Sequence, residues 1–254
     1  MHILVTNDDG VHAPGLLALA QAMRPLGEVT VFAPDRNWSA AGHTKTLGRP
    51  LRVDETQLAD GTPALATDGA PSDCVALALL GLIAPVDLVV SGINPHANIG
   101  DDITYSGTVT SAMEAVIGGI PGLAFSLEIP LDVKNADYSA ASEIARQVTQ
   151  KVIAEGLSKG TFLSTNIPYL PLEQMKGFQI TRQGERVYRD QLISRTDPFG
   201  RPYYWIGGEH PTGKLIAETD FGAINAGYVS ITPLQLDMTA EEEISRLQKW
   251  HWES

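Results

Sequence analysis

The chain opens with an apolar run that ends in two adjacent carboxylates. Residues 3–5 (Ile-Leu-Val) are typical of a buried strand in a parallel sheet. Residues 7–10 (Asn-Asp-Asp-Gly) have the composition of a turn, and a helical run follows from residue 16. Because open α/β sheets bind ligands beyond the carboxyl ends of their strands, Asp8 and Asp9 are expected at a ligand site.

Two neighbouring carboxylates repel each other, and a bound divalent cation commonly neutralises this repulsion. Carboxylate, hydroxyl and amide oxygens suit Mg²⁺ or Mn²⁺, whereas zinc favours histidine and cysteine. The six histidines show no HxxxH or HExxH spacing. The alternative is a polar turn that only caps the following helix, which the turn-forming residues would also explain.

Composition narrows the class of protein. The 254 residues suit one large domain or one domain with an appendage, and 43% hydrophobic residues can form a substantial core. A formal net charge of −12 disfavours a nucleic-acid groove or binding to an acidic membrane. The single cysteine, Cys74, excludes an intramolecular disulfide and a cysteine zinc cluster, and its apolar surroundings favour a place in the core. With no secretory signal and no 18-residue apolar stretch, a cytoplasmic location is expected.

Strand-like and helix-like segments alternate up to about residue 167, as in a parallel α/β sheet. Further strands are predicted at 28–33, 87–90, 122–126 and 161–164, with short β candidates at 50–54 and 64–67. Helices are predicted at 72–83, 108–117 and 136–155. The predicted fold is therefore a three-layer α/β core with a parallel sheet, which we assign to residues 1–176.

The pattern changes in residues 177–254. Segments 178–182, 187–194 and 202–206 predict an antiparallel β-ribbon with a turn at residues 197–200. A returning core strand at 228–232 and a terminal helix at 240–250 complete this part. The ribbon segments are rich in aromatic residues, which favours a contact between subunits. Folding of the ribbon back onto its own domain is the alternative.

Every loop that follows a strand in the first half is small and polar. Ser39 and His43 follow the second strand, and Asn94 and Asn98 follow the strand at 87–90. Because the carboxyl ends of parallel strands share one edge of the sheet, these side chains can converge with the first carboxylate pair. The second pair, Asp101-Asp102, could compete for a metal, but a helix-capping or solvated role is favoured.

Residues 105–109 (Tyr-Ser-Gly-Thr-Val) precede a predicted helix. Hydroxyls and free backbone N–H groups at a helix start form an anion site, so Ser106, Gly107 and Thr108 are candidates for binding phosphate. An ordinary Ser/Thr helix cap is the alternative. The chain has no GxxxxGK[ST] loop, which disfavours nucleotide-triphosphate hydrolysis of that type. His12 and His43 could serve as acid or base groups or lie at the surface.

Five motifs occur in order along nearly the whole chain. They are Asn7-Asp8-Asp9-Gly10, Ala33-Pro34-Asp35-Arg36-Asn37, Ser91-Gly92-Ile93-Asn94, Tyr105-Ser106-Gly107-Thr108-Val109 and Gly227-Tyr228-Val229-Ser230-Ile231-Thr232-Pro233. With them the chain resembles the SurE family of survival-protein 5′/3′-nucleotidases, metal-dependent phosphatases that act on nucleoside monophosphates. The stretch at 95–100 and the tail at 238–244 depart from the family pattern.

The resemblance implies a Rossmann-like core, a protruding ribbon and a homodimer or homotetramer. It also implies metal ligands at Asp8, Asp9, Ser39 and Asn94, and phosphate contacts near residues 106–108. The resulting hypothesis is a phosphomonoester hydrolase with one Mg²⁺ or Mn²⁺ per subunit, acting on nucleoside 5′- and 3′-monophosphates, with polyphosphate as a further candidate substrate.

In this hypothesis the catalytic residues are Asp8 and Asp9, with Asp8 the favoured general base toward an attacking water. The expected substrate contacts are Asn94, Asn98, Ser106, Gly107, Thr108 and His43. An aspartyl-phosphate mechanism is disfavoured because Gly10 stands two residues after Asp8, where such phosphatases have a second aspartate. A non-catalytic, metal-dependent nucleotide sensor remains the rival from another class.

Overall fold

A nine-stranded mixed sheet forms the centre of the computed structural model, which describes residues 1–252. Its strand order is β3-β4-β2-β1-β5-β6-β7-β11-β8. The strands are β1 (His2–Thr6), β2 (Glu28–Pro34), β3 (Val53–Gln57), β4 (Pro63–Thr67), β5 (Leu88–Asn94), β6 (Gly122–Glu128), β7 (Thr161–Pro168), β8 (Phe178–Ile180) and β11 (Val229–Gln235). Strands β4, β2, β1, β5, β6 and β7 run parallel, whereas β3 pairs antiparallel with β4 and β11 pairs antiparallel with β7.

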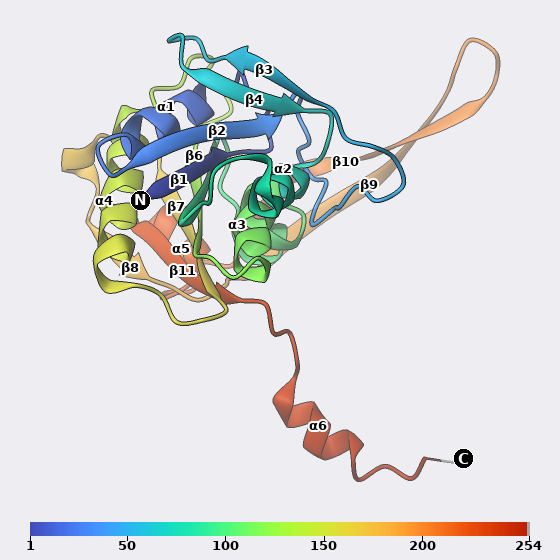
Figure 1. Cartoon of the computed structure of the whole chain (residues 1–254). Helices are drawn as coiled ribbons and strands as arrows, with labels where there is room; N and C mark the ends of the chain where they lie inside the picture. The colour runs from blue at the N-terminus through green and yellow to red at the C-terminus, as the bar shows by residue number, and fades with distance from the viewer. Residues whose placement is uncertain (253–254) are drawn as a thin grey trace.

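Helices cover both faces of this sheet (Figure 1). The helices within the described residues are α1 (Pro14–Met23), α2 (Pro71–Leu77), α3 (Gly107–Ile117), α4 (Ser139–Glu155), α5 (Asp220–Asn225) and α6 (Glu241–Leu247), of which α6 lies away from the sheet. Short 3₁₀ helices span Gly100–Thr104 and Leu172–Gln174, and a π-helical turn spans Ala78–Leu82. No helix within residues 1–252 is long and apolar enough to cross a membrane.

The alternation of β1 side chains explains the three layers. Ile3 and Val5 pack with α1 and α4 on one face, whereas Leu4 packs with Cys74 of α2 on the other. Because a strand points successive side chains to opposite faces, a strand that is apolar at every position must be covered on both sides. The three-layer α/β fold predicted from the sequence is confirmed, and Cys74 is buried as expected.

The order of the strands fixes where a ligand site can form. The chain passes from β1 to β2 on one side and later returns as β5 on the other side of β1. The loops after β1 and β5 therefore diverge, which opens a crevice at the carboxyl ends of these strands. This crevice lies at the edge of the sheet where the sequence predicts the site.

The C-terminal part differs from expectation in several places. Residues 178–182 do not belong to the ribbon, because β8 pairs in parallel with β11 at the edge of the main sheet. Helix α5 was not predicted, and the helix expected at 72–83 ends at Leu77 and continues as the π-helical turn. Residues 91–94, expected as a loop, extend β5, and Asn94 pairs with Ser126 of β6. The division of the chain at residue 176 stays a prediction.

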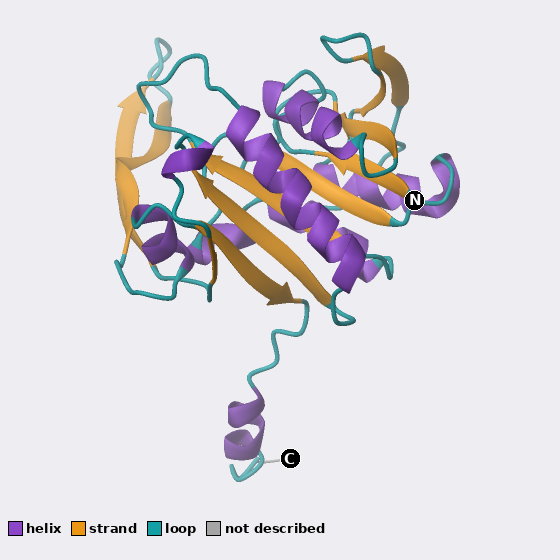
Figure 2. Ribbon diagram, turned by 90° about the vertical axis from the view of Figure 1, so that its left-hand side faces the viewer, coloured by secondary structure: helices purple, strands orange, loops and turns teal. Residues whose placement is uncertain are grey.

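The ribbon consists of β9 (Arg186–Thr196) and β10 (Pro202–Gly213), paired antiparallel. Its tip is the predicted turn, closed by the N–H of Gly200 on the Asp197 carbonyl at 3.0 Å. The ribbon protrudes from the body of the molecule, and α6 extends away from it in another direction (Figures 1 and 2). Phe199 and Ile206 are 83% and 86% exposed.

Candidate active site

A cavity of about 760 Å³ opens at the carboxyl ends of β1, β2, β5 and β6. Its volume lies within the range of small-molecule sites in proteins. The sequence-predicted residues that line it are Asp8, Asp9, Ser39, Asn94, Asn98 and Ser106. The fold thus brings together side chains that lie up to about a hundred residues apart in the chain, as the shared edge of a parallel sheet requires.

Asp8 lies at the floor of this cavity and is 3% exposed. Its Oδ1 accepts a hydrogen bond from the Thr108 hydroxyl at 2.5 Å, and its backbone carbonyl accepts one from the Trp38 N–H at 2.7 Å. The turn itself is braced by Asn7, whose side chain bonds both the carbonyl and the N–H of Gly10. The position of Asp8 is therefore fixed by the loop after β2 and by the first turn of α3.

Burial shapes the electrostatics of the carboxylate pair. Burial raises the pKa of Asp8, and hydrogen bonding to the Thr108 hydroxyl and contacts with the backbone of Thr108 and Gly107 oppose that increase. Burial, and then the neighbouring charge of Asp8, raise the pKa of Asp9 to about 7. Within the described residues neither carboxylate forms an ion pair with lysine or arginine. The pair is therefore a site where positive charge from a ligand would be strongly favoured.

Helix α3 approaches this pair with its N-terminus. A Cβ at Gly107 would lie 2.6 Å from the Asp8 Cβ, so only glycine allows the first turn of α3 to come this close. The Ser106 side chain caps the helix by accepting the Val109 N–H at 3.1 Å, which agrees with the cap interpretation. Ser106 also lines the cavity, whereas Thr108 is fully buried and directs its hydroxyl at Asp8.

Ser39 and Asn94 bring neutral oxygens to the same cavity. Ser39 lies in the loop after β2, where its N–H donates to Asn37 Oδ1 at 2.7 Å. Asn94 ends β5, and its Nδ2 donates to the His96 carbonyl at 2.5 Å, which leaves Oδ1 as its acceptor oxygen. Among the side chains that the structure describes, no three His, Cys, Asp or Glu are grouped as metal ligands. A cation here would therefore depend on the Asp8–Asp9 pair and neutral oxygens, a donor set that fits Mg²⁺ or Mn²⁺.

The remaining predicted residues have other partners. Asn98 lines the cavity, and its Nδ2 donates to Ser126 Oγ at 2.8 Å. His43 is not among the residues that line the cavity, because its Nε2 lies 2.9 Å from Glu114 Oε2 on α3. The Lys45 Nζ is 2.7 Å from the other oxygen of Glu114. His43 therefore helps to fasten the loop that carries Ser39, and its role toward phosphate stays a prediction.

Sequence reasoning missed one side of the cavity entirely. Arg186 at the start of β9, Thr212 of β10 and Phe221 of α5 line it, although all were assigned to the C-terminal extension. Asp102, expected to cap a helix or lie in solvent, also lines the cavity and accepts hydrogen bonds from Arg186 Nε and Tyr188 OH, both at 2.6 Å.

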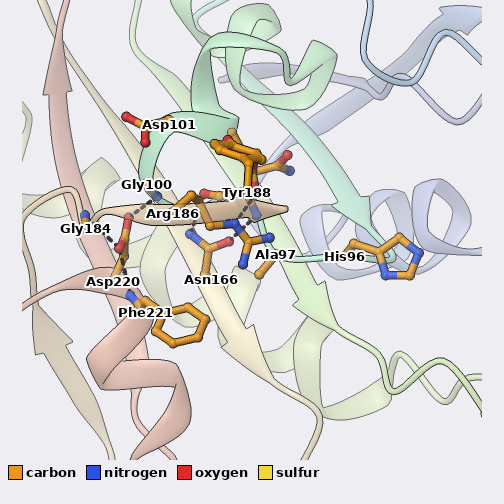
Figure 3. A network of polar contacts seen from close by, with 12 residues as sticks. His96, Ala97, Gly100, Asp101, Asn166, Gly184, Arg186, Tyr188, Asp220 and Phe221 are labelled. Atoms are coloured by element: carbon orange, nitrogen blue, oxygen red, sulfur yellow. Dashed lines mark hydrogen bonds and ion pairs between the residues drawn. The ribbon is translucent and has the colours of Figure 1, made fainter. Parts of the chain in front are cut away.

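A buried aspartate joins this side to the core. Asp220 accepts N–H bonds from Gly100 at 2.8 Å, Gly184 at 2.9 Å and Phe221 at 2.7 Å. Figure 3 shows its carboxylate between Gly100 and Gly184, with Arg186 and Tyr188 beside them. A single arginine and a single Asp-Phe pair have no spacing signal, so the sequence offers no motif that would have identified them.

The cavity can thus hold a metal on one side, an anion at the N-terminus of α3, and a further group against the base of the ribbon. A family model described as "Survival protein SurE" matches residues 3–190. The chain is 50% identical to the 5′-nucleotidase SurE of Chloroflexus aggregans over the full length of both proteins. It is 51% identical to the protein of the same name from Herpetosiphon aurantiacus, with 99% of each chain covered.

A solved structure shows that the similarity extends to the three-dimensional fold. The SurE protein from Aquifex aeolicus superimposes with a TM-score of 0.82 and 40% sequence identity, over 98% of each chain. The sequence motifs, the fold and the full-length relatives agree. This chain belongs to the SurE family.

Proposed function

We propose that this protein is a metal-dependent 5′-nucleotidase that hydrolyses the phosphomonoester of nucleoside 5′-monophosphates. The observation that carries the proposal is the buried Asp8–Asp9 pair, which faces the cavity beside the N-terminus of α3. The name 5′-nucleotidase, printed for relatives that are about 50% identical over the full chain, supports the same reaction. Hydrolysis of 3′-monophosphates and polyphosphate extends this proposal.

The proposed cofactor is one Mg²⁺ or Mn²⁺ per subunit, held by Asp8, Asp9, Ser39 and Asn94. The donor set fits such an ion, because two carboxylates without a basic partner share the cavity with hydroxyl and amide oxygens. When bound, a divalent cation supplies positive charge that offsets the repulsion between a phosphate and a chain of net charge −12.

The residues of the chain have distinct parts in the proposed reaction. Ser106, whose hydroxyl lines the cavity at the start of α3, donates to a phosphate oxygen, while the backbone of Gly107 and Thr108 contacts the Asp8 carboxylate beside it. Asp8 accepts the proton of the attacking water, and Thr108 holds the Asp8 carboxylate in place. Asn98 and His43 complete the set of proposed substrate contacts.

The proposal also includes a homodimer or homotetramer in the cytoplasm. The exposed apolar side chains of the ribbon support assembly, because a solvated two-stranded hairpin is barely stable and rarely exposes so many of them. Among the described residues these side chains include Leu192, Phe199, Trp205 and Ile206. The one cysteine is a free, buried thiol, which is compatible with a reducing compartment.

The decisive experiment measures phosphate release from 5′-AMP by the purified protein. We expect turnover that a chelator abolishes and added Mn²⁺ or Mg²⁺ restores. The same assay on 3′-AMP, 5′-dAMP and polyphosphate ranks the substrates. Binding of 5′-AMP without any turnover at saturating metal would contradict the proposal and establish the rival role of a nucleotide sensor.

A further inference from the structure

The base of the ribbon contributes a second wall to the cavity. Arg186, Thr212 and Phe221 come from three different elements, β9, β10 and α5, and all face the same space as Asp8 and Asp9. Among the described residues that line the cavity, Arg186 is the only lysine or arginine. The ribbon is therefore part of the site and not only a protrusion.

This wall is held rigidly against the core. The Asp220 carboxylate is 1% exposed, and its three N–H bonds join the base of the ribbon, the start of α5 and the 3₁₀ helix that leads to Ser106. Gln183 adds a bond from its Nε2 to the Gly100 carbonyl at 3.0 Å. A buried carboxylate with three donors fixes backbone positions well, because breaking one bond would leave a charged group unsatisfied.

Arg186 is oriented by its own partners. Its Nε lies 2.6 Å from Asp102 Oδ2, while Tyr188 OH donates to the other oxygen of the same carboxylate. This ion pair uses Nε and leaves the two terminal amino groups outside it. Because the arginine charge is already balanced by Asp102, the residue is better suited to stack its flat face than to attract a second anion.

Phe221 lies next to this guanidinium. The Arg186 Cζ is 6.0 Å from the centre of the Phe221 ring, and both groups line the cavity. Planar guanidinium and aromatic groups are the surfaces on which proteins stack unpaired nucleobases. A cavity of about 760 Å³ leaves room for a base and ribose beside a phosphate held at Ser106.

We propose that Arg186 and Phe221 form the binding surface for the nucleobase, so that the ribbon base gives the enzyme its preference for nucleotides over simpler phosphate esters. This inference rests on the proposed function, because it assigns a part of the same substrate. It predicts that the two residues contribute to the discrimination between 5′-AMP and ribose 5-phosphate, which lacks the base.

The test compares kcat/KM for 5′-AMP and for ribose 5-phosphate in the metal-loaded protein. The wild type should prefer 5′-AMP, and Phe221→Leu and Arg186→Gln should each lower the ratio of the two values roughly ten-fold or more, the range expected for one stacking contact. Phe221→Tyr keeps the ring and should restore the ratio. Arg186→Lys can keep an ion pair with Asp102 but lacks the planar group, and it should resemble Arg186→Gln.

Arg195→Gln is the matched control, because Arg195 lies on the same strand at an exposed position and does not line the cavity. If Arg186 and Phe221 only supported the structure, their variants would lower both values equally and leave the ratio unchanged. If Arg186 bound phosphate, Arg186→Gln would again lower both values and also weaken inhibition by inorganic phosphate.

Either result would overturn the inference, as would a wild type that hydrolyses both esters equally well. Each of these outcomes leaves the proposed phosphatase intact. A wild type that hydrolyses neither ester would instead contradict the proposed function itself.

Discussion

The two walls of the cavity are built in different ways. On the core side, Asp8 and Asn94 follow parallel strands that are covered by helices on both faces, and the backbone there is fixed by the sheet. On the ribbon side, Arg186 lies in a ribbon that polar bonds join to the core, and Phe221 belongs to the short helix α5, whose Asp220 and Ala223 are buried. The comparison assigns the chemistry to the wall that the sheet forms, and recognition and assembly to the wall that the C-terminal elements add.

Packing explains why the ribbon needs its anchors. The β1 residues are almost completely buried, so their positions are determined by apolar contacts on every side. A two-stranded ribbon has no core of its own and is marginally stable in water. Its base is therefore fixed by Asp102 and Asp220, while its tip, with Phe199 exposed, would gain most from contact with another subunit.

The largest effect on activity is expected at the core wall, the side of the cavity that carries Asp8, Asp9 and Asn94. Asp8→Asn and Asp9→Asn should each lower kcat/KM for 5′-AMP by roughly a hundred-fold or more, because charge stabilisation by a metal contributes several kcal/mol. Circular dichroism should show an intact fold, since each carboxylate supplies charge and not core packing. Asp101→Asn is the control, because that carboxylate is exposed and does not line the cavity. Wild-type turnover in either variant, at both limiting and saturating Mn²⁺, would exclude the metal assignment.

A smaller loss of activity is expected from changes at Thr108 and Ser106, which are not proposed metal ligands. Thr108→Val keeps the shape of the side chain but removes its hydrogen bond to Asp8, and Ser106→Ala removes a hydroxyl that lines the cavity. Each should lower kcat/KM by about ten- to a hundred-fold, the value of one charge-assisted hydrogen bond of roughly 1.5–3 kcal/mol. Ser106→Ala should also weaken inhibition by inorganic phosphate. Unchanged inhibition in this variant would move the phosphate site elsewhere, with Asn98 and His43 the next candidates.

The core wall should also make the metal-free protein sensitive to pH. The pKa values of Asp8 and Asp9 in the folded protein lie above the ordinary value of 3.8, with Asp9 at about 7. The folded state therefore holds more protons than the unfolded state between about pH 4 and 7, and stability must fall as pH rises through this window. In the presence of chelator, the wild-type melting temperature should drop over this range by a few degrees more than that of Asp9→Asn. If the melting temperatures of the two proteins fell equally with pH, the pKa of Asp9 would not be raised in the folded state.

The core wall could be predicted from the sequence, whereas the ribbon wall could not. Asp8, Asp9 and Asn94 follow strands whose apolar runs are visible, and the rule for parallel sheets then places them at one edge. Arg186 and Phe221 are held at the cavity by bonds between distant residues, such as that between Asp220 and Gly100, about 120 residues apart. Such a contact leaves no periodic pattern. The same reason explains why β8 was assigned to the ribbon. A strand of three residues is too short for its sequence pattern to indicate which strand it pairs with.

The smallest effect on turnover is expected at the ribbon tip. Replacing residues 197–201 by a two-residue Asn-Gly turn should change kcat/KM per folded chain by no more than about two-fold, because surface changes away from a site rarely exceed 0.5 kcal/mol. The same change should lower the mass of the assembly in sedimentation, since it removes the exposed Phe199. A wild type that sediments as a monomer at micromolar concentration would mean that the ribbon has no partner. If turnover fell together with the mass of the assembly, the ribbon tip would have to contribute to the cavity of another subunit. That cavity would then be built from two chains.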